Sequence, residues 1–218
     1  MTEYSQPPQA LADALLSQLP TLSLEEQKVS LAIYRLLAEG EPVSQERLAK
    51  AVVMPVNHLQ HMLEDWTGIY FDEAQQITGY WGLSLKPTPH KMQVKGVYLY
   101  AWCAWDTLFI PEILGETVEV ESLAPGEQST IQLHVSPGLV EAVSPQEAVL
   151  SFMLPDKKSL EQDVICNFCH YVHFFPSTEK AEDWIRDYPR TFVISLDEGS
   201  HIARLKNESQ YAGTLTAY

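Results

Sequence analysis

The chain has 218 residues, of which 45% are hydrophobic and 20% charged, and its formal net charge is −15 at pH 7. These values predict a soluble globular protein of one or two domains, large enough to bury a core. The excess of acidic groups repels phosphate backbones and anionic surfaces, so we expect neither nucleic acid nor a membrane as a partner. The first eight residues lack the basic and apolar regions of a secretory signal.

The first 86 residues have the pattern of helices followed by a hairpin. A capping box at Ser23 and Glu26 predicts a helix that ends before Gly40. The other expected elements are helices at 9–19, 45–52 and 55–66, the last with Pro55 as its first residue, and strands at 69–72 and 77–85. This order suggests a winged-helix-like helical unit over residues 1–86. The helix at 55–66 contains no Lys or Arg, so we expect it to pack against the rest of the chain rather than bind DNA.

The remainder of the chain is richer in strand patterns. Strands are expected at 92–94, 97–102, 116–121, 130–135, 139–143, 148–154, 172–175 and 192–195. Helices are expected at 103–114 and, from a cap at Ser177, to about residue 187. The predicted fold class is therefore α+β, in which the winged-helix-like unit precedes a mixed or antiparallel sheet region with flanking helices. We expect this second region, residues 87–218, to be catalytic because the candidate residues lie in it.

Cys103 and Asp106 are the first candidates. Cys103 follows a predicted strand and opens a predicted helix, whose dipole should lower the pKa of the thiol. Asp106 lies three residues further on, so a helix would place both side chains on one face, where the carboxyl can exchange a proton with whatever the sulfur binds. The structural alternative is a buried small residue beside a helix-start carboxylate.

Four aromatic residues surround this pair in the sequence, namely Tyr100, Trp102, Trp105 and Phe109. Aromatic surface excludes water, and we expect it to raise the pKa of the Asp106 carboxyl toward that of a useful acid.

Cys166 and Cys169 form a C-x-x-C motif. A thioredoxin-like site would place it between a strand and a helix, whereas here a strand is expected after it, with Cys169 and His173 on one side and His170 on the other. A zinc ribbon would need a second such pair, although one zinc ion held by the three cysteines with His170 or His173 stays open. Two thiolates and a carboxyl among aromatics suit a soft, thiophilic metal better than zinc.

Three cysteines are too few for a disulfide framework in a chain of this length, so we expect free thiols and a cytoplasmic location. His58 and His61 lie one turn apart on a predicted helix, but only Glu64 or Asp65 stands near as a further ligand, and we interpret both histidines as surface residues.

Two stretches of the sequence, residues 97–115 and 168–184, resemble the alkylmercury lyase family, also called organomercurial lyases. The first contains Trp102-Cys103-Ala-Trp-Asp106, and the second contains Phe168-Cys169 followed by Val172-His-Phe-Phe175. Shorter similarities in the same order cover most of the chain. The two catalytic cysteines and the aspartate of the family pattern fall on Cys103, Cys169 and Asp106.

The resemblance implies cleavage of the carbon–mercury bond of organomercury compounds, which gives a hydrocarbon and Hg(II). Cys103 and Cys169 would bind the mercury, with Asp106 beside it as the proton donor. No organic cofactor is implied, and the product ion would be removed by small cytosolic thiols or passed to mercuric reductase. Two other classes remain open: a non-catalytic protein that binds a soft metal, and a metal-responsive winged-helix sensor.

The sequence also departs from the family pattern. Some members have a cysteine where this chain has Ala124, and some have a second cysteine where it has His170. Cys166 matches no family position, so it is either a spectator or a nearby thiol that helps to pass the metal in or out.

Overall fold

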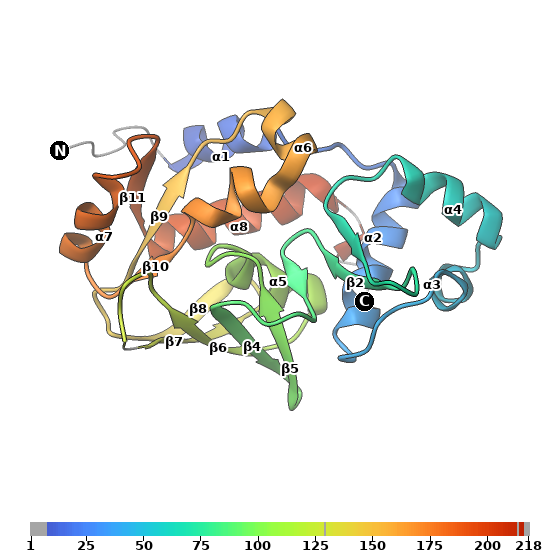
Figure 1. Ribbon diagram of the computed structural model, residues 1–218, viewed down its shortest axis with the longest axis horizontal. Helices are drawn as coiled ribbons and strands as arrows, with labels where there is room; N and C mark the ends of the chain where they lie inside the picture. Colours follow the sequence, from blue (N-terminus) through green and yellow to red (C-terminus); the bar gives the residue numbers. More distant parts are fainter. Residues whose placement is uncertain (1–7, 129, 213, 216–218) are drawn as a thin grey trace.

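The structure is a computed structural model that describes residues 8–128, 130–212 and 214–215 (Figure 1). Its helices are α1 (Pro8–Leu16), α2 (Leu24–Leu37), α3 (Gln45–Val52), α4 (Val56–Glu64), α5 (Asp106–Leu114), α6 (Lys157–Asn167), α7 (Thr178–Ile185) and α8 (Leu196–Gln210), with a 3-10 turn, η1, at Cys169–Tyr171. Its strands are β1 (Ile69–Phe71), β2 (Ile77–Tyr80), β3 (Leu83–Ser84), β4 (His90–Val94), β5 (Val97–Ala101), β6 (Val118–Leu123), β7 (Thr130–Ser136), β8 (Leu139–Ser144), β9 (Val149–Met153), β10 (Phe174–Phe175) and β11 (Thr191–Ser195).

The strands form two antiparallel sheets. The larger has the order β1-β2-β3-β5-β4-β6-β7-β8, and the smaller has the order β10-β9-β11. Strand β6 alternates buried and exposed residues, as expected for a sheet with one face on the core. Helix α5 packs on this sheet and α8 packs on α5, so α5 lies between the sheet and α8 (Figure 1). The predicted α+β composition is thus confirmed, with antiparallel pairing throughout the two sheets.

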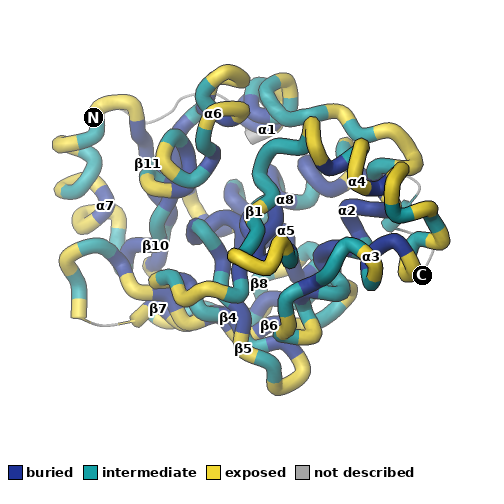
Figure 2. Tube along the Cα trace, turned by 45° about the vertical axis from the view of Figure 1, so that its right-hand side comes forward, coloured by how far each residue is buried: buried dark blue, intermediate teal, exposed yellow. Residues whose placement is uncertain are grey.

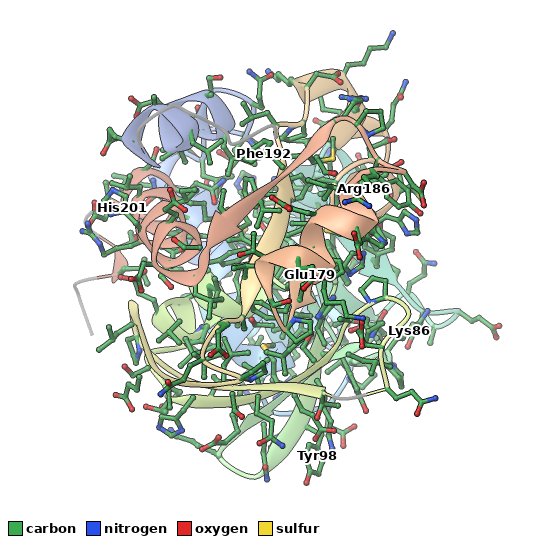
Figure 3. The ribbon with its side chains drawn as sticks, turned by 90° about the vertical axis from the view of Figure 1, so that its left-hand side faces the viewer. Lys86, Tyr98, Glu179, Arg186, Phe192 and His201 are labelled. Carbon is green, nitrogen blue, oxygen red and sulfur yellow. The ribbon has the colours of Figure 1, made fainter. Side chains whose placement is uncertain are left out.

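Burial follows the same layering. Figure 2 shows buried stretches gathered in the middle of the molecule around α5 and α8, whereas much of α4 is exposed. Helix α4 buries only Leu59 and Leu63 among its described residues. Helix α7, which includes Glu179, lies in front of the smaller sheet in Figure 3 and contacts β9 and β11. No helix in the part of the chain that the structure describes has the length and apolar character needed to cross a bilayer.

One local prediction is confirmed by hydrogen bonds. The amide of Ser23 donates to Glu26 Oε2 at 2.7 Å and the amide of Glu26 donates to Ser23 Oγ at 3.3 Å, which completes the capping box of α2. Strands β4 and β5 join through Lys95 and Gly96, whose φ angles of 48° and 84° form the tight turn that matches the twist of a hairpin.

Other predictions need correction. Pro55 is the N-cap of α4 rather than its first helical residue, because its backbone is extended. The strand expected at 77–85 is split into β2 and β3 by a turn at Trp81 and Gly82, which have φ angles of 31° and 99°. The strand expected at 172–175 is reduced to Phe174–Phe175, since η1 precedes it.

Helices α6 and α8 were not predicted. Helix α6 is kinked at Asp163, whose φ of −165° and ψ of 98° interrupt any helical periodicity. Helix α8 buries Gly199, Lys206 and Asn207 together with Leu196, Ile202 and Ala203, so polar and small residues interrupt the apolar stripe of its inner face.

The larger sheet continues past residue 86. Leu83 of β3 pairs with Ala101 of β5, so strands from both sides of that position share one sheet. Through this pairing the turn at Trp81 and Gly82 lies beside the end of β5, where the candidate residues begin.

Candidate active site

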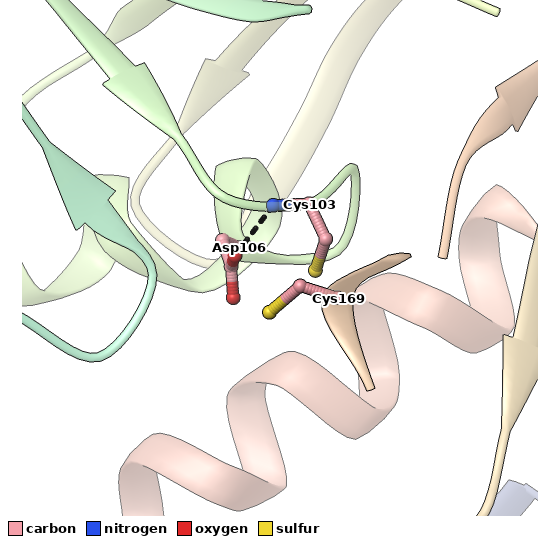
Figure 4. A group of neighbouring side chains, drawn as sticks. All are labelled: Cys103, Asp106 and Cys169. Carbon is pink, nitrogen blue, oxygen red and sulfur yellow. Dashed lines mark hydrogen bonds between the residues drawn. The ribbon is translucent and has the colours of Figure 1, made fainter. Parts of the chain in front are cut away.

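Three side chains that the sequence singled out converge in the interior. Sγ of Cys103, a carboxylate oxygen of Asp106 and Sγ of Cys169 all lie within 4.8 Å of one another (Figure 4). All three residues are buried, with exposed fractions of 0%, 4% and 2%. Residues separated by more than sixty positions in the chain thus form one cluster.

Cys103 and Asp106 are held by the segment that joins β5 to α5. The amide of Trp102 donates to the carbonyl of Gly82 at 2.8 Å, which fixes the chain at the end of β5. Asp106 is the first residue of α5, and its Oδ2 accepts a hydrogen bond of 2.8 Å from the amide of Cys103 (Figure 4). Cys103 therefore precedes the helix rather than opening it. The two side chains meet because the carboxylate reaches back to the turn, not because they share a helical face.

Cys169 comes from the opposite side of the site, at the start of η1. The amide of Ala104 donates to the carbonyl of Val172 at 3.1 Å, which ties the two cysteine segments together directly. Because Cys169–Tyr171 is a 3-10 turn, the strand alternation expected for Cys169, His170 and His173 is wrong. The backbone of this 3-10 turn directs Cys169 inward, while His170 stays exposed.

Burial sets the acidity of the cluster. It raises the pKa of Asp106 to about 6, although hydrogen bonds from Cys103 and the charge of Lys206 act in the opposite direction. A raised pKa of Asp106 is the direction expected from the sequence. Burial also raises the pKa of Cys103, with a further rise from its hydrogen bond to Cys169 and the charge of Asp106. The expected lowering of the Cys103 pKa by a helix dipole is therefore wrong, because desolvation of the thiolate dominates.

The pKa of Cys169 is also raised by burial, but its hydrogen bond with Cys103 lowers it. Burial is the larger effect, so the net shift of the Cys169 pKa is upward, as it is for Cys103.

A small, mainly apolar cavity of about 20 Å³ adjoins the cluster. Its wall includes Asp106 and Cys169 and the aromatic residues Trp81, Trp102, Trp105, Phe109 and Phe168. The volume holds about one water molecule. Trp102, Trp105 and Phe109 were expected here, whereas Tyr100 is not among the described residues that line the cavity.

Sequence reasoning missed Gly82 and Lys206, which also line this cavity. A Cβ atom on Gly82 would lie 2.6 Å from Cγ and Oδ1 of Asp106, so only glycine fits against the carboxyl. A glycine inside a predicted strand is a signal of close backbone approach and could have indicated this contact.

A larger cleft of about 390 Å³ lies on the other side of Cys169 and Trp102, which line both spaces. Its wall also includes Tyr70, His90 and His173. The rings of His90 and His173 are stacked with centroids 5.8 Å apart. Cys169 is therefore the sulfur nearest to a space large enough for a small molecule, whereas Cys103 lines neither space within the described residues.

The remaining candidates lie outside the cluster. All three cysteines are free, and Cys166 is exposed, with its amide donating to Asp163 Oδ1 at 3.0 Å. In the described part of the chain, only Cys103, Asp106 and Cys169 form a group of possible metal ligands, so the zinc site that adds Cys166 and a histidine is not assembled. His58 and His61 are exposed, as expected, and lie beside Glu25 and Glu64.

The fold and the cluster together define a class of protein: one that buries two thiols and a carboxyl in an apolar site suited to a soft metal. Comparison with known proteins gives the family. Residues 83–206 match the family model described as alkylmercury lyase. The chain belongs to the alkylmercury lyase family.

Individual relatives agree with this assignment. The chain is 37% identical over 172 residues to an alkylmercury lyase of Staphylococcus epidermidis, covering 79% of this chain and 78% of the relative. It is 35% identical over 175 residues to an alkylmercury lyase of Pseudomonas putida, covering 80% and 81%. A solved structure, the mercury-bound form of MerB2, has the same fold, with a TM-score of 0.73 over 93% of this chain and 98% of that chain at 22% identity.

Proposed function

We propose that this protein is an organomercurial lyase that cleaves the carbon–mercury bond of organomercury compounds and releases a hydrocarbon and Hg(II). The observation that carries the proposal is the convergence of two buried thiols and one buried carboxyl within 4.8 Å. In this proposal Cys103 and Cys169 bind mercury and Asp106 donates the proton. Membership of the alkylmercury lyase family supports it independently.

The chemistry needs those groups because the carbon–mercury bond is nearly apolar and carbon is a poor leaving group as a carbanion. Thiolates are the ligands that a soft metal prefers, and two of them push electron density through mercury onto carbon. Carbon can then accept a proton from a general acid. An apolar wall keeps competing water away from the reacting atoms.

The proton balance closes within the cluster. The Cys169 thiol loses its proton to solvent and its sulfur bonds to the mercury of R–Hg⁺. The Asp106 carboxylate takes the proton of the Cys103 thiol, and the second thiolate bonds to mercury. Asp106 then delivers that proton to carbon, which forms a C–H bond with the electron pair of the broken C–Hg bond. The hydrocarbon leaves, Hg(II) stays on two thiolates, and Asp106 is again a carboxylate.

Product handling follows from the strength of the mercury–thiolate bonds. We propose that small cytosolic thiols remove the ion, with mercuric reductase as its acceptor, and that the protein works in the cytoplasm without an organic cofactor. The cleft beside Cys169 supports this route because it offers a second thiol a path to the bound metal.

We further propose that the N-terminal part, residues 1–86, is a winged-helix-like unit that supports the catalytic region at 87–218 rather than binding DNA. Residues 1–7, 129, 213 and 216–218 of these two regions lie outside the described residues. Support comes from α2, which packs on α5, and from Tyr34 Oη, which donates to the carbonyl of Trp81 at 2.6 Å. This bond fastens the turn that contacts Asp106.

The direct test is incubation of the protein with a phenylmercury salt and an excess of a small thiol, with benzene measured in the headspace. The expected result is one benzene per phenylmercury over many turnovers. Tight binding of phenylmercury without benzene would instead indicate a non-catalytic binder. A salt-dependent shift of promoter DNA by the metal-loaded protein, again without benzene, would indicate a sensor.

A further inference from the structure

Lys206 is a buried cation in the wall of the candidate active site. It lies on α8, is 4% exposed, and lines the same small cavity as Asp106. Its Nζ lies 3.8 Å from the centroid of the Phe109 ring and 5.4 Å from that of Tyr211. Within the described residues its ammonium makes one hydrogen bond, to Asn207 Oδ1 at 3.3 Å. Aromatic faces and one amide thus replace the water that an ammonium normally binds.

Such a position is costly unless nearby negative charge compensates for it. Burial lowers the pKa of Lys206 to about 7, and the charges of Asp106 and Glu112 raise it. An apolar side chain of similar size would avoid the cost of removing a charge from water at this position. The stability of α8 therefore gives little reason for a lysine here, which points to a role in the cavity that it lines.

The contacts of α8 fix where the charge acts. Asn207 Nδ2 donates to the carbonyl of Phe109 at 2.9 Å and to Glu112 Oε2 at 2.7 Å, which fastens α8 to α5 next to the cavity. The Glu112 carboxylate thus already has a donor in Asn207. Asp106 has hydrogen bonds from Cys103 and lines the same cavity as Lys206.

The proposed reaction places one negative charge in this cluster at each stage. First the Asp106 carboxylate carries it, beside a neutral Cys103 thiol. When the proton moves to Asp106 and both thiolates bind R–Hg⁺, the mercury complex carries it. After the hydrocarbon leaves, Hg(II) with two thiolates is neutral and Asp106 carries the charge again. A charge that stays in an apolar pocket is stabilised by a fixed opposite charge close to it.

We propose that Lys206 in its ammonium form is a positioning residue of this reaction, whose charge offsets the negative charge of the Cys103, Asp106 and Cys169 cluster. It acts through Asp106, because a cation in the wall of the same cavity stabilises the carboxylate that accepts the proton of Cys103. This inference rests on the proposed lyase function.

The test compares Lys206→Met and Lys206→Gln, which remove the charge, with Lys206→Arg, which keeps it. Ile202→Val is the matched control, because Ile202 is a buried residue one turn earlier on α8. Three quantities are measured for each variant: the thermal midpoint, the stoichiometry of phenylmercury binding, and the rate of benzene release at saturating phenylmercury with excess thiol.

We expect the uncharged variants to keep the thermal midpoint and the binding stoichiometry but to release benzene at least tenfold more slowly. Lys206→Arg should be several times faster than Lys206→Met, and Ile202→Val should match the unsubstituted protein. An uncharged variant that folds and turns over at the normal rate would overturn the proposal. So would failure of both uncharged variants to fold, since the charge would then serve the fold. Absence of benzene from the unsubstituted protein would reject the lyase function itself.

Discussion

At the scale of single residues, the two thiols differ in position and therefore in expected role. Cys103 is enclosed beside Asp106, whereas Cys169 borders both the small cavity and the larger cleft. Sequence alone indicated which residues to consider, through a family resemblance. It could not indicate their acidity, because burial raises the pKa of Cys103 where a dipole argument predicts the opposite.

The thiols give the first prediction. Cys103→Ser and Cys169→Ser should each abolish benzene release from phenylmercury, because a hydroxyl is a hard ligand that cannot replace a thiolate on mercury. Cys166→Ser is the matched control, since Cys166 is exposed and outside the cluster, and it should keep most of the activity. Headspace benzene with excess small thiol is the measurement. Near-normal turnover in either of the first two variants would contradict the assignment.

The carboxyl gives the second prediction. An amide oxygen at position 106 can still accept the 2.8 Å hydrogen bond from the amide of Cys103, so Asp106→Asn should fold normally. It cannot deliver a proton, and loss of a general acid typically costs about 10²- to 10⁴-fold in rate. We expect phenylmercury to bind with unchanged stoichiometry while benzene release falls by that factor. A variant that retains more than a tenth of the normal rate would show that another group protonates carbon.

At the scale of elements, the turn between β2 and β3 positions Asp106. Gly82→Ala should disturb it, because the added Cβ would lie 2.6 Å from Cγ of Asp106 and because alanine is strained at a φ of 99°. Gly96→Ala separates the two effects, since Gly96 has a φ of 84° but nothing within 4 Å of its Cβ position. Each should lose about 1–3 kcal/mol of stability from strain.

Only Gly82→Ala should lose benzene release, by tenfold or more per folded molecule. Urea unfolding and single-turnover benzene release measure the two effects separately. Equal activity of the two variants would mean that the turn does not hold the carboxyl.

Elements with their own sequence signals were predictable, and elements defined by tertiary contacts were not. The capping box of α2 is a local signal that predicted the correct structure. Helix α8 has a capping box as well, at Ser195 and Glu198, but its inner face contains Gly199 and Lys206 where an apolar stripe is expected. Gly199 packs closely there, since a Cβ would lie 3.2 Å from side-chain atoms of Leu108 and Leu150. That constraint comes from packing and leaves no periodic pattern.

At the scale of the whole molecule, one buried core extends from α1 and α2 through α5 to α8 and the smaller sheet. The cluster is assembled from two segments of this core that lie far apart in the sequence, so its geometry depends on the global fold. The stability of that fold should in turn depend on three groups near the site: the buried His90 and Asp106 and the partly buried His173.

Between pH 5 and 6 the histidines and the carboxyl affect stability in opposite directions. Burial lowers the pKa of His90 to about 3 and that of His173 to about 4, from an ordinary value of 6.5. At these two histidines the unfolded chain therefore binds nearly two more protons than the folded protein does. Burial raises the pKa of Asp106 from 3.8 to about 6, so at this carboxyl the folded protein binds nearly one more proton than the unfolded chain does. The unfolded state therefore gains about one net proton, and stability should fall by about 1.4 kcal/mol for each pH unit of acidification.

Variants at two of these groups test the balance in opposite directions. His90→Asn removes one of the groups that bind a proton when the chain unfolds. It keeps a polar partner for Ser122 Oγ, which lies 2.7 Å from His90 Nδ1. The stability of this variant should therefore hardly change from pH 6 to 5. Asp106→Asn removes the opposing uptake, so its stability should fall about twice as steeply as that of the unsubstituted protein. Urea unfolding at pH 5.0, 5.5 and 6.0 measures all three slopes. If the slopes were the same in the three proteins, these groups would not be titrating differently in the folded and unfolded states, and the apolar burial that defines the site would not control its protons.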